Sequence, residues 1–401
     1  MRLIALMTAL LIAAPAYACI NDRDTRRAQK EAEPEDPMQG LPPIPNVLRG
    51  RFDRYPDLYY EMRRDRVLGA LEQDPNQIAL YDDLAVAYDR LGDDEHAIDW
   101  MDRKLVLLEN TSDKSSDEWK EHWYSYHANQ GTFYAHNWIH NGANRANLAE
   151  LLKARDLIAK AIAIKPNAHF GREKYQLMAI NWIAETPEIQ SYGELPNLLG
   201  LRNEDIDEIT AEGKLKEKGL WDAVQGLSGL IVLGAAWESV DVTYALGIAL
   251  RIAGDSENAY AAMLRCKELI ASGKRSFVPG APVGERLMAM LENALPAPEK
   301  KSRADAISLN YEMEREMAEG WQRDRNEKIT ALLKTGRHPD TDFAFWAEVD
   351  AIPSPKPENS AAPSERWLWF GLLGLVVAAI GGSAVTLIRR ANPRQTNHPR
   401  A

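Results

Sequence analysis

Residues 80–101, "LYDDLAVAYDRLGDDEHAIDWM", carry apolar side chains at spacings of three and four. This is the period of one face of an α-helix, and the pattern is interrupted once. The first stripe contains Leu80, Leu84, Ala85 and Tyr88, and the second contains Ala97, Ile98 and Met101. Gly92 suits the end of one helix, and the acids that follow it suit the beginning of the next. The pattern predicts two antiparallel helices that approach closely where Ala85 and Ala97 provide little bulk.

The same spacing recurs in three further segments of the chain. The matching positions are Gly131, Tyr134, Ala154, Ile158, Ala161 and Pro166 in one segment, Leu246, Gly247, Leu250, Ala259, Met263 and Cys266 in another, and Arg63, Val67, Ala70 and Pro75 in a half unit near the start. A repeated helical pair indicates an array of stacked units. Alternation typical of strands is hard to find, so we expect an all-α body.

This pattern resembles the tetratricopeptide repeat, a helix-turn-helix unit of 34 residues with small residues at the helix contacts and a closing proline. Residues 78–111 and 240–273 keep that length, and residues 124–168 contain an enlarged turn. Lys104 and Arg63 depart from the pattern, because each stands where a small residue is usual. The resemblance implies a partly degenerate solenoid of helical hairpins; an unrelated helical bundle is the alternative.

The rest of the body, which we place at residues 47–335, is predicted to be helical but less regular. Residues 221–237 are apolar on nearly every side, which favours a buried core helix. Residues 194–219 are rich in acids and turn formers, which favours a connecting excursion. Residues 286–295 and 304–335 are expected to be closing helices, the second of them a charged cap.

The beginning of the chain has the features of an export signal. Residues 1–18 combine an early arginine, an apolar run and a small-x-small end, which is typical of a cleaved signal peptide. Cleavage there would make Cys19 the first mature residue, so lipid attachment at Cys19 is one option and a disulfide with Cys266 is another. Residues 19–46 are charged and rich in proline, which predicts a flexible leader.

The end of the chain has the features of a membrane anchor. Residues 367–388 contain no charge and are long enough to cross a bilayer as a helix. Residues 389–401 are basic, which predicts a cytoplasmic tail and a body on the other side of the membrane. Residues 336–366, rich in proline and serine, are expected to be a stalk between body and membrane.

Two further properties of this anchor bear on its location and assembly. The short basic tail and the scarcity of cysteine favour a single-pass protein of a bacterial inner membrane, with its body in the periplasm. Small side chains at every fourth position let two membrane helices pack closely, which raises the option of a homodimer. These residues are Gly374, Ala378 and Gly382.

Composition restricts the class of partner. The chain has 59 acidic and 48 basic residues and a formal net charge of −11. Because part of the basic charge lies in the tail, the body is more acidic still, and such a surface repels nucleic acid. With only 2 cysteines, the body must be stabilised by its core rather than by a framework of disulfides.

Candidate chemistry is confined to one group of histidines. The sequence contains no phosphate-binding loop, no nucleophile elbow, no HExxH motif and no calcium loop, so we expect neither enzymatic activity nor a cofactor. Half of the 8 histidines fall in one short stretch, as His122, His127, His136 and His140. On one helix, His136 and His140 would lie one turn apart, where both could bind zinc or copper. An aromatic packing layer and a polar groove are the alternatives.

An array of helical hairpins offers a curved surface, and the resemblance implies how that surface is used. In the tetratricopeptide family, the first helix of each unit lines a concave groove that holds a segment of another protein. The corresponding positions are Asp82, Val86 and Asp89, then Ala128, Thr132 and His136, then Tyr244, Ile248 and Arg251. The expected function is that of a membrane-tethered adaptor for another exported protein. The alternative is a metal-binding or enzymatic module centred on residues 122–140.

Overall fold

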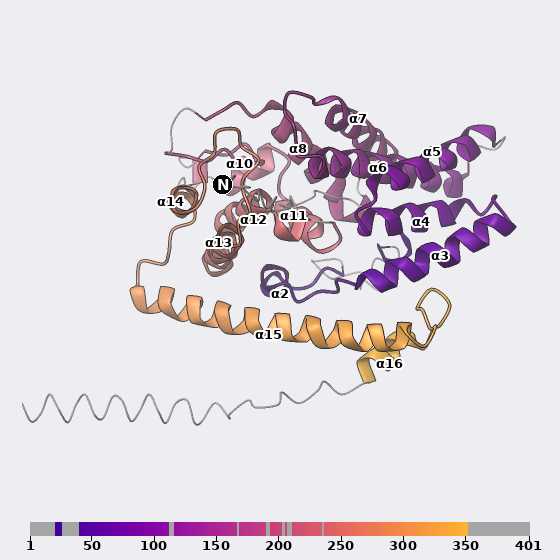
Figure 1. The fold of residues 1–401 in the computed structure, drawn as a ribbon. Coiled ribbons are helices and arrows are strands. Elements are labelled where there is room, and N and C mark those ends of the chain that lie inside the picture. The colour runs from indigo at the N-terminus through magenta and orange to yellow at the C-terminus, as the bar shows by residue number, and fades with distance from the viewer. Residues whose placement is uncertain are drawn as a thin grey trace, which may run out of the picture. The chain divides into compact units, whose positions relative to one another are not determined.

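A computed structural model describes the following parts of the chain: residues 21–25, 40–111, 116–166, 168–189, 193–202, 205–206, 211–234 and 236–351. Within these residues all regular structure is helical, which confirms the expected all-α class (Figure 1). The helices are α2 (Ile44–Arg49), α3 (Asp57–Gln73), α4 (Ile78–Arg90), α5 (Asp94–Asn110), α6 (Asp117–His140), α7 (Ala149–Ile164), η1 (Ala168–Gly171), α8 (Arg172–Glu185), α10 (Ala211–Glu217), α11 (Ala223–Val232), η2 (Ala236–Glu238), α12 (Val240–Ile252), α13 (Ser256–Ala271), α14 (Glu285–Ala294), α15 (Lys301–Leu333) and α16 (Phe345–Ala351).

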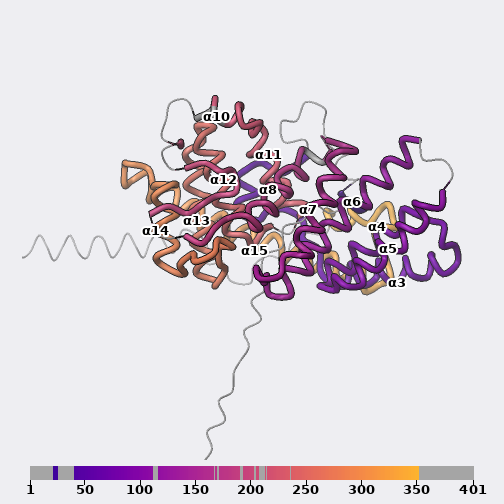
Figure 2. The backbone as a smooth tube through the Cα atoms, turned by 90° about the horizontal axis from the view of Figure 1, so that it is seen from above, coloured from indigo at the N-terminus to yellow at the C-terminus, as the bar shows by residue number. Residues whose placement is uncertain are grey.

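Helices that follow one another along the chain also pack against one another. From α3 to α8 each helix contacts the next, α8 contacts α11, and the succession continues from α11 through α14. The view from above shows α3 to α6 at one side of this unit and α12 to α14 at the other (Figure 2). The three pairs α4–α5, α6–α7 and α12–α13 are the antiparallel hairpins expected from the spacing of apolar residues.

The turn between α4 and α5 follows from its residues. Gly92 has φ 80°, a backbone conformation that suits glycine, and it ends α4. The carboxylate of Asp93 then accepts the N–H of His96 and caps α5. Gly254 and Asp255 do the same between α12 and α13. These turns bring the second helix of each pair back along the first.

Small residues stand where the paired helices approach most closely. Ala85 and Ala97 are fully buried in one cluster. In the α6–α7 pair, a Cβ added to Gly131 would lie 2.9 Å from side-chain atoms of Ile158 and 3.0 Å from the carbonyl oxygen of Ala154. Gly131 is therefore required by the proximity of α7, since its own backbone conformation is ordinary helix.

Replacing Gly131 by alanine is expected to lower the free energy of unfolding by about 1–3 kcal/mol, because the added methyl group must push α7 away. Gly69, on α3, has no neighbouring atom within 4 Å of an added Cβ and serves as the matched control. The Gly69→Ala change is expected to raise stability by about 0.5–1 kcal/mol, because alanine favours helix. Urea unfolding measures both changes. Equal effects at the two sites would contradict the close approach of α7.

The long helix α15 runs along the other helices instead of capping the end of the array (Figure 1). It contacts α13, α2, α3 and α16. Arg315 of α15 binds Glu268 of α13 with N–O distances of 3.0–3.2 Å, and Gln322 donates to the carbonyl of Arg54 at 2.8 Å. Its role is therefore that of a strap across the unit, and the expectation of a terminal cap needs this correction.

Two segments that the sequence placed outside the body are part of it. Residues 21–25, in the expected leader, make buried contacts with α3 and α6, and α2 begins at Ile44, also inside that leader. Residues 336–351, in the expected stalk, fold back onto α3, where Phe345 and Val349 of α16 are buried beside Tyr59. Composition predicted extended chain here because neither segment has enough apolar residues to form a core alone; the first is held by polar contacts with α3 and α6, and the second packs on α3 and α15.

Two helical expectations also need revision. Helix α11 covers only part of residues 221–237, and the side chain of Trp221 is 76% exposed. The region 194–219 was expected to be an excursion, yet Leu195, Leu198 and Leu199 are buried in the main core. The leucines of this loop pack into the main core, and a search for helical periodicity does not detect such residues because the loop is not a regular helix.

The membrane and processing predictions concern residues outside the described part of the chain. These are residues 1–18, Cys19, 367–388 and 389–401. Among the described residues, none of the helices is both long and apolar enough to cross a membrane. Cys266, on α13, is a free and fully buried thiol, as expected of a residue at a helix contact.

Candidate functional site

Residues 21–25 are held by their main chain on α6. The side-chain oxygen of Asn129 accepts the N–H of Asn21 at 2.7 Å, and its amide group donates to the C=O of Asn21 at 3.0 Å. Asn129 is completely buried. The buried side-chain nitrogen and oxygen of Asn21 have no hydrogen-bond partner among the described residues. Asn129 therefore forms its hydrogen bonds with the main chain of Asn21 and not with the side chain at that position.

The next three side chains, Asp22, Arg23 and Asp24, each meet a group of opposite charge. Arg63 of α3 donates from Nη1 to Asp22 at 3.1 Å and to Asp24 at 2.9 Å. Asp83 of α4 accepts the N–H of Arg23 at 3.0 Å and its Nε at 2.8 Å. The acid-base-acid order of the segment is thus matched by a base on α3 and an acid on α4.

Arg63 is the centre of this charge network. Its side chain is 0% exposed, and besides the two leader carboxylates it contacts Asp340 through Nε at 3.0 Å and Nη2 at 2.8 Å. Burial alone would raise the pKa of Asp340, but the charge and hydrogen bonding of Arg63, together with the charges of His338 and Arg23, hold that pKa well below its ordinary value. Arg23 also bonds to the carbonyl of Asp340 at 3.3 Å. We call Arg63, Asp83, Asn129 and Asp340 the leader site.

A second buried network of hydrogen bonds and one ion pair contacts Asn129 of the leader site. Lys104 of α5 binds both carboxylate oxygens of Asp82 at 2.7 Å and the hydroxyl of Ser125 at 2.8 Å. Asp82 in turn accepts the amide of Asn129 at 3.0 Å. Lys104 and Asp82 have side-chain exposures of 0% and 1%. This network fixes the orientation of the Asn129 carboxamide, and with it the direction of the bound main chain.

Space remains beside the leader site. A cavity of about 540 Å³ is bordered by Asp22 and Asp24 on one side and by Trp321 and Arg325 of α15 on another. Arg90, at the end of α4, also lines it. The cavity could receive side chains of a ligand longer than the five described leader residues.

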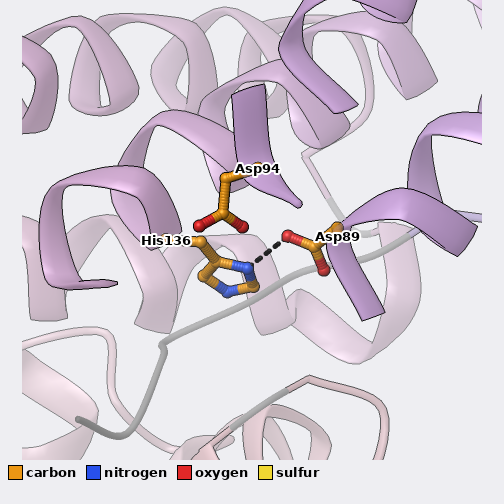
Figure 3. A group of neighbouring side chains, drawn as sticks. All are labelled: Asp89, Asp94 and His136. Carbon is orange, nitrogen blue, oxygen red and sulfur yellow. Dashed lines mark hydrogen bonds and ion pairs between the residues drawn. The ribbon is translucent and has the colours of Figure 1, made fainter. Parts of the chain in front are cut away.

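Further along α4 and α6 lies a group that we call the acid–histidine cluster, formed by Asp89, Asp94, His136 and His140. His136 Nδ1 is 2.5 Å from a carboxylate oxygen of Asp89 at the end of α4, and the carboxylate of Asp94 lies close to the same imidazole ring (Figure 3). One turn along α6, His140 Nδ1 is 2.5 Å from Asp94 Oδ2. Ligand atoms of Asp89, Asp94 and His136 all lie within 4.8 Å of one another.

The cluster is mostly removed from water. Side-chain exposure is 2% for both Asp89 and His136 and 4% for Asp94, while His140 is 37% exposed. Burial raises the pKa of Asp94, although the hydrogen bond with His140 opposes that rise. The same bond raises the pKa of His140 above its ordinary value. Within the described residues, Asp94 Oδ1 and His136 Nε2 are buried without a hydrogen-bond partner.

Of the nine expected groove positions, two belong to the acid–histidine cluster and one contacts the leader site. Asp82 supports Asn129, while Asp89 and His136 belong to the acid–histidine cluster. The other six lie at contacts between helices: Val86, Ala128, Thr132, Tyr244 and Ile248 are buried, and Arg251 is half-buried. Tyr244 and Ile248 belong to the main core around α12, so the structure does not bring the third unit's set to the leader site.

Several functional residues were not predicted from the sequence. Asn129 is one position beyond the expected Ala128, and Asp340 lies in the presumed stalk. Asp94 was expected only as an acid at the beginning of a helix, which it is, and its burial was not expected. A signal existed for Arg63, because a charged residue at a position that is usually small requires a buried partner.

No protein-family model matches the chain, and neither a curated protein nor a solved structure is significantly similar to it. The functional argument therefore depends on the geometry of the leader site and the acid–histidine cluster.

Proposed function

We propose that this protein is a membrane-tethered scaffold that binds a short segment of another exported protein at the leader site. Helices arranged as hairpins would present the site, as in the tetratricopeptide repeats that the sequence resembles. The segment 367–388 would anchor the scaffold in a bacterial inner membrane with its body in the periplasm. A homodimer through Gly374, Ala378 and Gly382 would place two sites side by side.

The observation that carries the proposal is the pair of hydrogen bonds between the Asn129 side chain and the main chain of Asn21. A buried carboxamide that offers an acceptor to the main-chain N–H and a donor to the C=O of one residue is suited to hold a segment with any side chain at that position. Specificity would come from Arg63 and Asp83, which contact the side chains of residues 22–24. The favoured ligand therefore has acid, base and acid in succession.

In this proposal the chain's own leader occupies the site until a partner displaces it. At the site Arg23 is 31% exposed and Asp24 is 20% exposed, whereas Asn21, Asp22 and Thr25 are buried, so a partner must also replace the contacts of these three buried residues. An intramolecular ligand has a high effective concentration, so a partner must bind more tightly or reach the adjoining cavity. The cavity beside Asp22 and Asp24 gives a longer peptide that additional contact.

Binding of a peptide in trans tests this function. A full-length variant with Asp22→Ala, Arg23→Ala and Asp24→Ala keeps the site but weakens its own occupant. A fluorescent peptide of residues 20–27, "INDRDTRR", is expected to bind this variant at least about 10-fold more tightly than it binds the wild type, because the wild-type leader competes. Fluorescence anisotropy measures both affinities.

Asn129→Ala on the same leader-substituted background is expected to weaken peptide binding by about 10-fold or more, since two hydrogen bonds to the peptide main chain are lost. Asn137 lies two turns along α6 and bonds to Glu150, so Asn137→Ala is the matched control and should bind as before. Circular dichroism checks that each variant is folded. Equal affinity of the two folded variants for the peptide would exclude the leader site as the binding site.

A further inference from the structure

We propose that the acid–histidine cluster binds one zinc ion, with Asp89, Asp94 and one nitrogen of His136 as its protein ligands. This inference is independent of peptide binding at the leader site. The three residues come from three helices: the end of α4, the beginning of α5 and the C-terminal part of α6. The short turn at Gly92 brings the two carboxylates close to the same imidazole (Figure 3).

The spacing of the three side chains suits a first-row metal ion. Zinc binds imidazole nitrogen and carboxylate oxygen at about 2.0–2.2 Å, so its ligands lie roughly 3–4 Å from one another. The candidate atoms of Asp89, Asp94 and His136 are all within 4.8 Å of one another. This spacing is close to that of ligands around a bound ion, and three protein ligands would leave a fourth position for water.

Burial and charge favour a cation at this place. Two carboxylates with 2% and 4% side-chain exposure lie close together, and removing them from water is unfavourable unless positive charge compensates them. Asp94 Oδ1 is buried beside His136 with no hydrogen-bond partner among the described residues. A divalent ion would supply both the missing charge and the missing partner. The mixed donor set of imidazole and carboxylate favours zinc over magnesium or calcium, which prefer oxygen alone.

His140 would act as a positioning residue. It holds Asp94 Oδ2 through Nδ1, as histidines and carboxylates commonly support one another around metals. With 37% exposure it also lies on the side of the cluster that is open to solvent, where an ion would enter. Loss of such a supporting residue typically weakens metal affinity by about 10–100-fold, and we expect this range for His140→Ala.

Metal analysis of the purified full-length protein is the test. After loading with zinc sulfate and gel filtration, the wild type is expected to retain about one zinc per chain by mass spectrometry. The double variant Asp89→Asn, His136→Gln should retain less than about one tenth of that amount, because both changes remove ligands while keeping side-chain size. The matched control is Asp93→Asn, His96→Gln, an exposed acid–histidine pair in the same turn, which should bind zinc as the wild type does.

Two results would overturn the proposal. The first is a wild type that retains no zinc after loading; the cluster would then be a network of ion pairs in which a protonated histidine balances the acids. The second is zinc that persists in the double variant. Should that variant fail to fold, cobalt titration of the wild type decides: a saturable visible absorption band that zinc abolishes supports the site, and its absence rejects it.

Discussion

Replacing Arg63 by methionine is expected to lower the free energy of unfolding by about 3–5 kcal/mol, the usual cost of removing one partner from a buried charge network. Arg63 is fully buried, and its guanidinium contacts Asp22, Asp24 and Asp340. Methionine fills much of the same volume, so the loss would be electrostatic. The urea midpoint and slope of unfolding, followed by circular dichroism, measure the change.

The neighbouring residue provides the control. Arg64 pairs with Asp65 at the surface, where the two side chains are 32% and 67% exposed, so Arg64→Met should cost less than about 1 kcal/mol. Arg63→Lys should fall between the two, because lysine keeps the charge but cannot bind several carboxylates in one plane. Hydrogen exchange at residues 21–25 should rise in Arg63→Met and stay unchanged in Arg64→Met. Equal costs for the two methionine variants would contradict the central role of Arg63.

Breaking the pair between Lys104 and Asp82 is the second large effect. Lys104→Met would leave Asp82 buried without its cation, and we expect a loss of about 3–5 kcal/mol in the free energy of unfolding. Adding Asp82→Asn removes the orphaned charge and keeps a side-chain oxygen for the amide of Asn129. The double variant should therefore recover at least about 2 kcal/mol relative to Lys104→Met alone.

The exposed pair of Lys120 and Asp117, with side-chain exposures of 58% and 98%, is the control for this cycle. Lys120→Met should change stability by less than about 1 kcal/mol, and Asp117→Asn should show no coupling with it. Additive losses for Lys104→Met and Asp82→Asn would mean that the buried pair is not coupled. The measurement is a double-mutant cycle in urea.

The sequence predicted those parts of the fold that depend on neighbours along the chain. The hairpin of α4 and α5, its turn at Gly92 and the close contact at Gly131 all follow from residues within about one repeat. Each depends on a local property of the sequence: the period of apolar residues for the hairpin, a glycine with positive φ for the turn, and the absence of a side chain for the close contact. The resulting all-α class was correct for the same reason.

The leader site could not be predicted in this way, because it combines segments that no local period connects. Asn21 and Asp340 reach Asn129 and Arg63 from opposite ends of the body, and both lie in stretches whose composition indicates extended chain. The alignment with the tetratricopeptide pattern also selected the wrong neighbour. It placed Ala128 in the groove, although Ala128 packs on α7, and it did not select the adjacent Asn129.

The departures from the repeat pattern were more informative than the pattern itself. Arg63 and Lys104 stand at positions where the family usually has a small residue, and both are 0% exposed in the structure. A buried cation needs an anion beside it, so each irregularity predicted a partner without naming it. The structure supplies these partners as Asp22, Asp24 and Asp340 for one and Asp82 for the other.

The contacts of Arg63 also have a consequence for the order of folding. Its partners lie 41 positions before it and 277 positions after it along the chain. Contacts over such separations form late, and domains fold from the N-terminus as they emerge during synthesis. The hairpins can therefore assemble while the leader site is still incomplete. The contacts around Arg63 are complete only after residue 340 has been synthesised. A shorter nascent chain therefore lacks the contact with Asp340.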